Sequence, residues 1–288
     1  MAQGASRFAW MDDRVVPFEQ AKIPIDDRGL LFAESLYEVI PVTGGKARML
    51  PEHIGRMRAA SEPIELGGGV PDDGMWEKIV GELVAHEQVE EGLLYAQLTG
   101  GSAPRQHLPQ HRPRPRFFAY LLPFRFPRAD AAARGIALQS FPDPRWSRCD
   151  LKTTMLLPGV LAKRDAVARG ADEALFVGPD GSVREGASTN VFLVEDNRLI
   201  TPLQNQHLLP GITRPLVGQL AAETGRSVDH ETLPLSRLLK GSEVFVTSTT
   251  LLVTPVVRID GQAIGDGQGG PVARELAQRL RARLDLRG

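Results

Sequence analysis

The segment RWSRCDLKTTMLLPGVLAKRDA, residues 145–166, contains a lysine whose surroundings differ from those of every other lysine in the chain. Lys152 lies between an arginine-rich polar stretch and an apolar run, so we expect its side chain to be at least partly buried. Burial disfavours the ammonium form and lowers the pKa of a lysine, which lets the amine attack a carbonyl or carry a Schiff base. The alternative is an ion pair with Asp150 or a nearby carboxylate, and spacing alone favours that alternative.

Lysine is rare in this chain, because only six of the 34 basic residues are lysines. The other five have ordinary structural explanations: a Gly-Gly turn, an amphipathic helix, a helix end or a polar connector. They are Lys22, Lys46, Lys78, Lys163 and Lys240. A lysine-dependent chemistry would therefore use Lys152.

Downstream, the segment VREGASTNVFLV, residues 183–194, places an acid beside a run of small residues. Glu185 follows a Pro-Asp-Gly turn, and Gly186 to Asn190 lead into a predicted strand. Small residues allow a flat ligand to approach the backbone, and a neighbouring carboxylate can hold a proton on a ring nitrogen. Local sequence alone favours an ordinary turn acid in contact with solvent.

Two further segments carry groups that suit a phosphate. In LLPGITRPLVGQL, residues 208–220, Gly211 precedes a predicted helix whose first turn includes Thr213 and Pro215. The free N–H groups and the dipole of such a turn attract an anion. In VTSTTLLVTP, residues 246–255, a predicted strand ends in four hydroxyl residues, 247 to 250, that can donate to phosphate oxygens. Each segment alone is a weak signal, and together they suggest a phosphate site.

The composition is typical of a folded globular protein, with 42% hydrophobic and 24% charged residues over 288 positions. This length favours two domains. The formal net charge is −1, so we expect neither nucleic acid nor a membrane surface as a partner. A single cysteine, Cys149, the lack of a long apolar stretch and opening residues without a secretory pattern favour the cytoplasm.

The first part of the chain predicts a small α+β domain at residues 1–121. Apolar periodicity and turn residues give each expected element. They are hairpins over 7–16 and 36–50 that turn at Asp12-Asp13 and Gly44-Gly45, helices from Pro51 and over 72–89, a strand over 93–99, a loop over 100–116 and a buried strand over 117–124.

The rest of the chain predicts a connector at 122–133 and a larger C-terminal domain at 134–288, in which apolar strands alternate with helices. The expected strands lie at 136–141, 173–178, 190–195 and 243–248, the helices at 159–170, 213–224 and 271–284, and the hairpin turns at 179–181 and 196–197.

Several common catalytic patterns are missing. The Lys152-Thr153 pair lacks the upstream glycines of a P-loop, no strand leads into G-x-G-x-x-G, and His86-Glu87 has no second histidine at zinc-protease spacing. No G-x-S-x-G motif occurs, and the six scattered histidines and one cysteine show no metal-ligand spacing. We therefore expect no metal site, no P-loop or dinucleotide-binding motif and no serine-hydrolase mechanism.

Seven segments together resemble the fold-type IV pyridoxal 5′-phosphate (PLP) enzymes, and among them the class IV aminotransferases of the D-amino acid aminotransferase group. The similarity runs over nearly the whole chain, to VTPVVRIDG near residue 260. The segments are DRGLLFAESLYEV, PEHIGRMRAAS, TGGSAPRQH, RWSRCDLKTTMLLPGVLAKRDA, VREGASTNVFLV, LLPGITR and FVTSTTLLVTPVV. Their order and spacing reverse the local interpretations of Lys152 and Glu185, and favour functional roles for both.

The resemblance implies an α+β fold with a small N-terminal domain, a larger C-terminal pseudobarrel domain, PLP in the cleft and a homodimer. Lys152 matches the lysine that holds PLP as a Schiff base and moves a proton between the amino-acid α-carbon and the cofactor. Glu185 matches the acid that pairs with the pyridine nitrogen, which makes the ring an electron sink. Arg56 matches the phosphate-binding arginine. The other implied cofactor-binding residues are Ser188, Ile212, Thr213, Ser248 and Thr249.

The resemblance also implies a substrate-binding set. Tyr37 matches an active-site tyrosine. Arg105 and His107 match the R-x-H pair that binds the substrate carboxylate with this tyrosine and reaches into the neighbouring subunit's site. A planar guanidinium can meet a carboxylate bidentately. Fixing the carboxylate also fixes which α-substituent faces Lys152, and hence which enantiomer can react; Thr250 is expected on the same substrate side.

The activity implied is transamination of D-amino acids, such as D-alanine and D-glutamate, with a 2-oxo acid acceptor. It would be a ping-pong exchange through pyridoxamine phosphate. The alternatives are a branched-chain or other class IV aminotransferase, an aminodeoxychorismate lyase, or a PLP-binding protein with a regulatory role. The chain departs from the family pattern at Ala33-Glu34-Ser35, where a Gly-Asp-Gly-like run is usual, and at Pro41, where a basic residue can stand. Both departures concern the substrate side.

Overall fold

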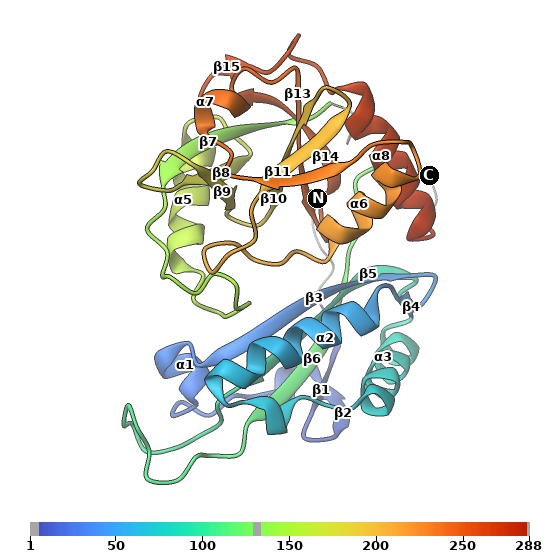
Figure 1. Ribbon diagram of the computed structural model, residues 1–288. Helices are drawn as coiled ribbons and strands as arrows, with labels where there is room; N and C mark the ends of the chain where they lie inside the picture. The colour runs from blue at the N-terminus through green and yellow to red at the C-terminus, as the bar shows by residue number, and fades with distance from the viewer. Residues whose placement is uncertain (1–5, 129–133, 287–288) are drawn as a thin grey trace. The chain divides into compact units, whose positions relative to one another are not determined.

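The computed structural model describes residues 6–128 and 134–286, and the chain divides into two compact units (Figure 1). The first unit comprises the chain up to Arg125 together with Leu151–Met155. The second comprises Phe126–Asp150 and the chain from Leu156 onward. The five residues Leu151–Met155, which include Lys152, therefore belong to the N-terminal unit. Residues 129–133, the last part of the predicted connector, lie outside the described residues.

The first unit is built on a six-stranded antiparallel sheet in the order β2-β1-β6-β5-β3-β4. Both predicted hairpins are confirmed, because Asp12 and Asp13 and then Gly44 and Gly45 have the positive φ that a tight two-residue turn requires. The strands are β1 (Phe8–Met11), β2 (Arg14–Pro17), β3 (Ser35–Thr43), β4 (Lys46–Ala47), β5 (Glu91–Thr99) and β6 (Arg116–Pro123).

Two long helices cover one face of this sheet (Figure 1). In α3, Trp76, Ile79 and Leu83 are fully buried, and the Asp72 side chain caps the helix by accepting the Met75 N–H at 2.8 Å. The opposite face of the sheet carries the alternate residues of each strand, including Tyr37. The helices of this unit are α1 (Arg28–Phe32), α2 (Leu50–Ser61) and α3 (Asp73–Glu87), with 3₁₀ turns η1 (Phe18–Gln20), η2 (Glu62–Ile64) and η3 (Gly67–Gly69).

The described part of the second unit contains a nine-stranded mixed sheet in the order β12-β11-β10-β13-β14-β7-β8-β9, with β15 paired to β14. It curls so that β9 contacts both β10 and β11. Three neighbouring pairs, β11 with β12, β14 with β7 and β7 with β8, are parallel. The strands are β7 (Ile136–Pro142), β8 (Glu173–Val177), β9 (Val183–Gly186), β10 (Asn190–Glu195), β11 (Arg198–Pro202), β12 (Val228–Glu231), β13 (Glu243–Ser248), β14 (Leu252–Ile259) and β15 (Gln262–Ala263).

The helices α5 (Leu157–Ala168), α6 (Thr213–Ala222) and α8 (Pro271–Arg283) pack against this curled sheet. α5 contacts β7 and β8, whereas α6 and α8 contact β13; a short α7 (Leu235–Leu238) precedes β13. The buried Glu243 carboxylate accepts the backbone N–H groups of Val272 and Ala273, so a strand residue caps α8. The two units together confirm the predicted α+β class. In the part of the chain that is described, no helix is long and apolar enough to cross a membrane.

Candidate active site

Lys152 is attached to the first unit by a short antiparallel contact with the start of β3. The Tyr37 N–H donates to the Lys152 carbonyl at 3.0 Å, and the Thr154 N–H donates to the Ser35 carbonyl at 3.2 Å. Leu36 and Thr153 form a β-bridge between them. The Lys152 side chain is half-buried, and its Nζ lies 4.3 Å from the centre of the Tyr37 ring. The structure therefore brings two predicted site residues, Lys152 and Tyr37, into direct contact.

A chain of hydrogen bonds fixes this lysine segment further. Ser35 Oγ lies 2.9 Å from Thr154 Oγ1 and accepts from Gln97 Nε2 at 2.9 Å, while the Tyr95 hydroxyl donates to Gln97 Oε1 at 2.8 Å. The Tyr95 ring in turn stacks on that of Tyr37, with 5.7 Å between the ring centres. The tyrosine beside Lys152 is thus held through its ring as well as through its backbone.

Arg56, the predicted phosphate ligand, belongs to a buried charged cluster between α2 and β3. Its Nε and Nη2 donate to the two oxygens of Glu38 at 2.7 and 2.6 Å, and His53 Nδ1 lies 2.7 Å from Glu38 Oε2. Burial alone raises the pKa of Glu38, but the charge and hydrogen bonds of Arg56 and His53 outweigh it and lower the pKa to about 2. Burial also lowers the pKa of His53, despite the opposing effect of Glu38. Glu38 therefore fixes the direction of the Arg56 side chain.

Arg105 and His107 lie on the loop between β5 and β6, and both are exposed. The Arg105 Cζ lies 5.6 Å from the centre of the Phe32 ring, and the His107 ring centre lies 5.5 Å from it. One aromatic ring of α1 therefore contacts both members of the predicted carboxylate-binding pair.

Glu185 lies in β9 of the second unit, where it is only 4% exposed. Its Oε1 pairs with Arg145 Nη1 at 2.6 Å, and its Oε2 accepts from Asn190 Nδ2 at 3.0 Å and from the Leu209 N–H at 3.1 Å. Arg145 also pairs with Asp143 at 2.9 Å. Burial lowers the pKa of Arg145, but its two carboxylate partners outweigh that effect and raise it. Arg145 therefore stays charged and compensates the buried Glu185 carboxylate.

Asn190 joins the surroundings of Glu185 to the two predicted phosphate segments. It pairs with Thr247 in the ladder between β10 and β13, and its Nδ2 also donates to the Leu209 carbonyl at 3.2 Å. A Cβ on Gly211 would collide with Asn190 Oδ1, so only glycine allows this close approach. The turn before α6 and the end of β13 are therefore held close to Glu185.

The hydrogen-bonding groups of these two segments suit a phosphate. α6 begins after Ile212. In its first turn the Arg214 N–H donates to Gly211 O at 3.2 Å and Pro215 has no N–H, so the backbone donors offered to a phosphate are those of Ile212 and Thr213. Ser248 Oγ accepts the Leu251 N–H at 3.0 Å and lies 3.4 Å from Thr250 Oγ1. Thr247 Oγ1 is buried and has no hydrogen-bond partner among the described residues. Backbone amides and hydroxyls together form the donor set that a phosphate group requires.

The predicted residue Ser188 has another partner. Its side chain donates to the fully buried Glu173 at 2.6 Å, and Glu173 also pairs with Lys163 Nζ at 3.3 Å. Four residues that hold Glu185 and Arg56 in place had no role assigned from the sequence: Arg145, Asn190, Glu38 and His53. All four fall within segments that carry the family resemblance, which is the one sequence signal that could have pointed to them.

Comparison with known proteins gives a consistent result. Residues 35–259 match the model of the family described as amino-transferase class IV. The D-alanine aminotransferases of Staphylococcus haemolyticus and Bacillus licheniformis are each 35% identical to this chain; the alignments cover 93% of it and 94% and 93% of the respective relatives.

The fold is also similar to solved structures. A T.th. branched-chain amino acid aminotransferase, in complex with N-(5′-phosphopyridoxyl)-L-glutamate, has a TM-score of 0.86 and 28% identity. The alignment covers 98% of this chain and 96% of that one. The Escherichia coli branched-chain amino acid aminotransferase has a TM-score of 0.85 at 23% identity, with 95% and 93% of the two chains covered, which is a likeness of fold.

We expect Glu38→Gln to lower the free energy of unfolding at pH 7 by about 3 kcal/mol, because it removes the counter-charge of the buried Arg56. Glu38 stabilises the fold fully above pH 4.5, its pKa when unperturbed, and loses this effect as the pH falls toward about 2. The difference between wild type and variant should therefore shrink on acidification.

Urea unfolding at pH 7 and pH 3 measures this difference. Glu77→Gln on the exposed face of α3 is the matched control, because it removes the same charge from the surface. A Glu38→Gln variant as stable as this control at pH 7 would contradict the assigned role.

Proposed function

Because the chain belongs to the class IV aminotransferase family and is an aminotransferase whose cofactor is PLP, we propose that it acts on D-amino acids, such as D-alanine and D-glutamate, with a 2-oxo acid as acceptor. The observation that carries this substrate class is the Arg105–His107 pair, which stands exposed on one loop against Phe32. Two cationic or hydrogen-bonding groups side by side suit the α-carboxylate of an amino acid.

Bound PLP supplies an electron sink for the bond-breaking step at the amino-acid α-carbon. Lys152 would hold the cofactor through Nζ and would carry the proton to and from the amino-acid α-carbon. Its contact with the Tyr37 ring supports this role, because a half-buried amine beside an aromatic face has a restricted set of positions. The backbone hydrogen bonds to β3 fix the position of the Lys152 backbone, from which the side chain extends.

Glu185 keeps the pyridine nitrogen of the cofactor protonated. The support for this role is its burial beside the permanently charged Arg145, with Asn190 and the Leu209 N–H holding the second oxygen. Arg56 and the segments after Gly211 and Thr247 bind the phosphate. The residues assigned to the phosphate and the rest of the cofactor are Arg56, Ser188, Ile212, Thr213, Ser248 and Thr249.

The substrate carboxylate is bound by Tyr37, Arg105 and His107, and Thr250 lies near the side chain of the substrate. We include in the proposal a homodimer in which Arg105 and His107 serve the site of the neighbouring subunit. The reaction is then a ping-pong exchange, because one carboxylate-binding set receives the amino acid and the 2-oxo acid in turn. The proposed location is the cytoplasm, consistent with a single, buried cysteine, Cys149.

A branched-chain substrate is the second candidate. The fold resembles a branched-chain amino acid aminotransferase at 28% identity over nearly the full chain. Two features of this chain on the substrate side, Pro41 within β3 and the Ala33-Glu34-Ser35 run before it, differ from the pattern of the D-amino acid group. The identity of the reacting enantiomer separates the two candidates.

We expect the purified holoenzyme to convert D-alanine and D-glutamate at least about a hundredfold faster than their L-enantiomers, because, once the carboxylate is fixed, only one enantiomer directs its single α-hydrogen toward Lys152. Half-reactions with paired enantiomers of alanine, glutamate and leucine, followed through cofactor absorption and release of the corresponding 2-oxo acid, give this ratio. Lys152→Ala is the control and should abolish exchange. A preference for L-leucine would favour the branched-chain candidate instead.

Arg105→Ala should raise KM for D-alanine by about tenfold to a hundredfold, because it removes a charged partner of the carboxylate. Retention of PLP should not change. Steady-state kinetics and cofactor absorption after dialysis measure the two effects separately. Arg114→Ala, an exposed arginine on the same loop, is the matched control. Equal losses of substrate and cofactor binding would mean that Arg105 has only a structural role.

A further inference from the structure

α1 lies directly against the loop that carries Arg105 and His107. Arg28 is buried, with 6% of its surface exposed, and its terminal nitrogens donate to two carbonyls of that loop. Nη1 donates to Gln106 O at 2.8 Å and Nη2 to His107 O at 3.0 Å. The Arg28 backbone N–H also donates to Gly101 O at 2.8 Å. One arginine therefore holds the loop both where it leaves β5 and at the R-x-H sequence.

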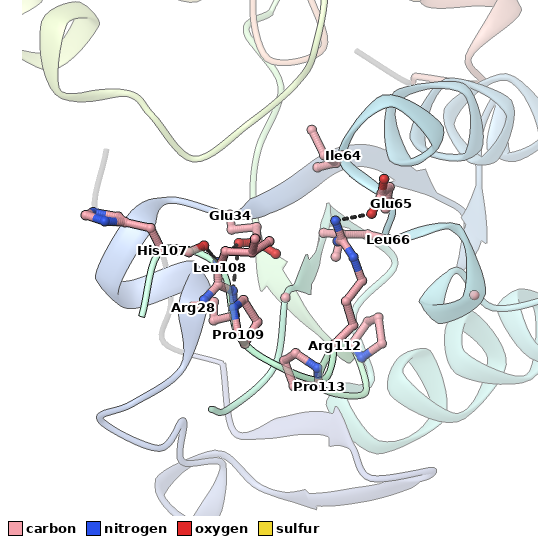
Figure 2. Close-up of a pocket in the computed structure, with 13 residues that line it drawn as sticks. Arg28, Glu34, Ile64, Glu65, Leu66, His107, Leu108, Pro109, Arg112 and Pro113 are labelled. Atoms are coloured by element: carbon pink, nitrogen blue, oxygen red, sulfur yellow. Dashed lines mark hydrogen bonds and ion pairs between the residues drawn. The ribbon is translucent and has the colours of Figure 1, made fainter. Parts of the chain in front are cut away.

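The Arg28 side chain is itself held in place. Its Nε donates to Glu34 Oε2 at 2.7 Å, and Nη2 lies 2.6 Å from the same oxygen. The Gly100 N–H donates to the Glu34 carbonyl at 2.9 Å, so Glu34 also contacts the start of the loop. Figure 2 shows Arg28 and Glu34 paired near His107, at the wall of a cavity of about 410 Å³. Because its counter-charge is adjacent, Arg28 can remain buried.

Phe32, one turn along α1, contacts the side chains that the loop presents. Its ring centre lies 4.9 Å from the Arg28 Cζ, 5.6 Å from the Arg105 Cζ and 5.5 Å from the His107 ring centre. The ring thus lies against a buried arginine and the two exposed residues of the R-x-H pair. Cation–π attraction favours an arginine in that position.

A loop of this kind needs such support. Between Thr99 and Arg116 the chain forms neither helix nor strand, and Arg105 and His107 are exposed. A charged pair binds a carboxylate well only when its geometry is held to within about 0.5 Å by neighbouring residues. The bonds from Arg28 fix the loop backbone, and the Phe32 ring restricts the two side chains.

We propose that Arg28 and Phe32 are positioning residues that preorganise Arg105 and His107 for the substrate carboxylate. This inference rests on the proposed function and deepens it, because it makes the affinity of Arg105 and His107 for the carboxylate depend on residues of α1. Amino acids and 2-oxo acids share this carboxylate, so both half-reactions depend on α1. A substrate analogue without the carboxylate does not depend on it.

The test compares holoenzymes carrying Arg28→Lys or Phe32→Leu with wild type and with Arg58→Lys, a surface arginine of the same unit. Lysine keeps the charge but carries its donors on one nitrogen, whereas Arg28 meets Glu34 and the two carbonyls with Nε, Nη1 and Nη2. For Arg28→Lys we expect KM for D-alanine and for pyruvate to rise about tenfold or more, with kcat within about twofold. Phe32→Leu should change both KM values in the same direction by a few fold, and Phe32→Tyr, which keeps the ring, should restore them.

Two readouts separate positioning from a general loss of structure. The Kd for propanoate, from the change in cofactor absorption on titration, should rise in parallel with KM. The half-reaction of D-alaninamide, which has no carboxylate, should be unchanged. An equal loss with D-alaninamide would overturn the inference. If Arg28→Lys does not fold, the Phe32→Leu and Phe32→Tyr pair decides the question by the same criteria.

The outcome is distinguishable from a failure of the proposed function. If wild type transaminates D-alanine and Arg105→Ala is impaired, but Arg28→Lys and Phe32→Leu keep wild-type KM values, the positioning role alone is wrong. If wild type shows no reaction with any D-amino acid, the proposed function is wrong.

Discussion

The position of the Lys152 amine depends on a short antiparallel contact between residues 152–154 and the start of β3. The chain leaves the second unit for only Leu151–Met155, and two backbone hydrogen bonds and one β-bridge dock this segment on the sheet. Side-chain bonds through Ser35 then hold Thr154 from the other side. Without this contact, Lys152 would follow the conformation of a connecting segment. With it, the amine lies 4.3 Å from the centre of the Tyr37 ring.

The second constraint is that a buried charge needs a partner of opposite charge. Each unit contains a buried carboxylate that is paired with an arginine. Glu38 is compensated by Arg56, and Glu185 by Arg145, which also pairs with Asp143. A buried carboxylate remains ionised only where such partners offset the loss of hydration. The consequence is that Arg145 compensates the buried Glu185 carboxylate, and that Glu38 fixes the direction of the Arg56 side chain.

Local patterns predicted much of the fold. Asp12-Asp13, Gly44-Gly45 and Asp196-Asn197 form the expected turns, and the expected helical runs form α2, α3, α5, α6 and α8. These features depend on residues close in sequence. The excursion of Leu151–Met155 and the parallel pairing of β14 with β7 were not predictable in this way, because they depend on contacts between residues far apart.

The same distinction applies to the site. Lys152, Glu185 and the hydroxyl run at the end of β13 stood out in the sequence, and the family resemblance then implied the roles proposed for them. The residues that orient them are separated by long stretches of chain: Arg145 and Glu185 by 40 positions, Arg28 and His107 by 79. No local pattern pairs such residues, because the pairing is produced by the sheets that bring them together.

One continuous segment, residues 28–37, contacts both the loop of Arg105 and His107 and the segment that carries Lys152. Its beginning holds the loop of Arg105 and His107 through Arg28, Phe32 and Glu34, and its end holds the lysine segment through Ser35 and Tyr37. A displacement of this segment would therefore move the proposed carboxylate-binding pair and the Lys152 amine together. In the proposed dimer the pair serves the neighbouring site, so the segment would connect the geometry of the two sites. Within this segment the Glu34 carboxylate accepts from Arg28 and the Ser35 hydroxyl bonds that of Thr154, so one short run contacts both the loop and the lysine segment.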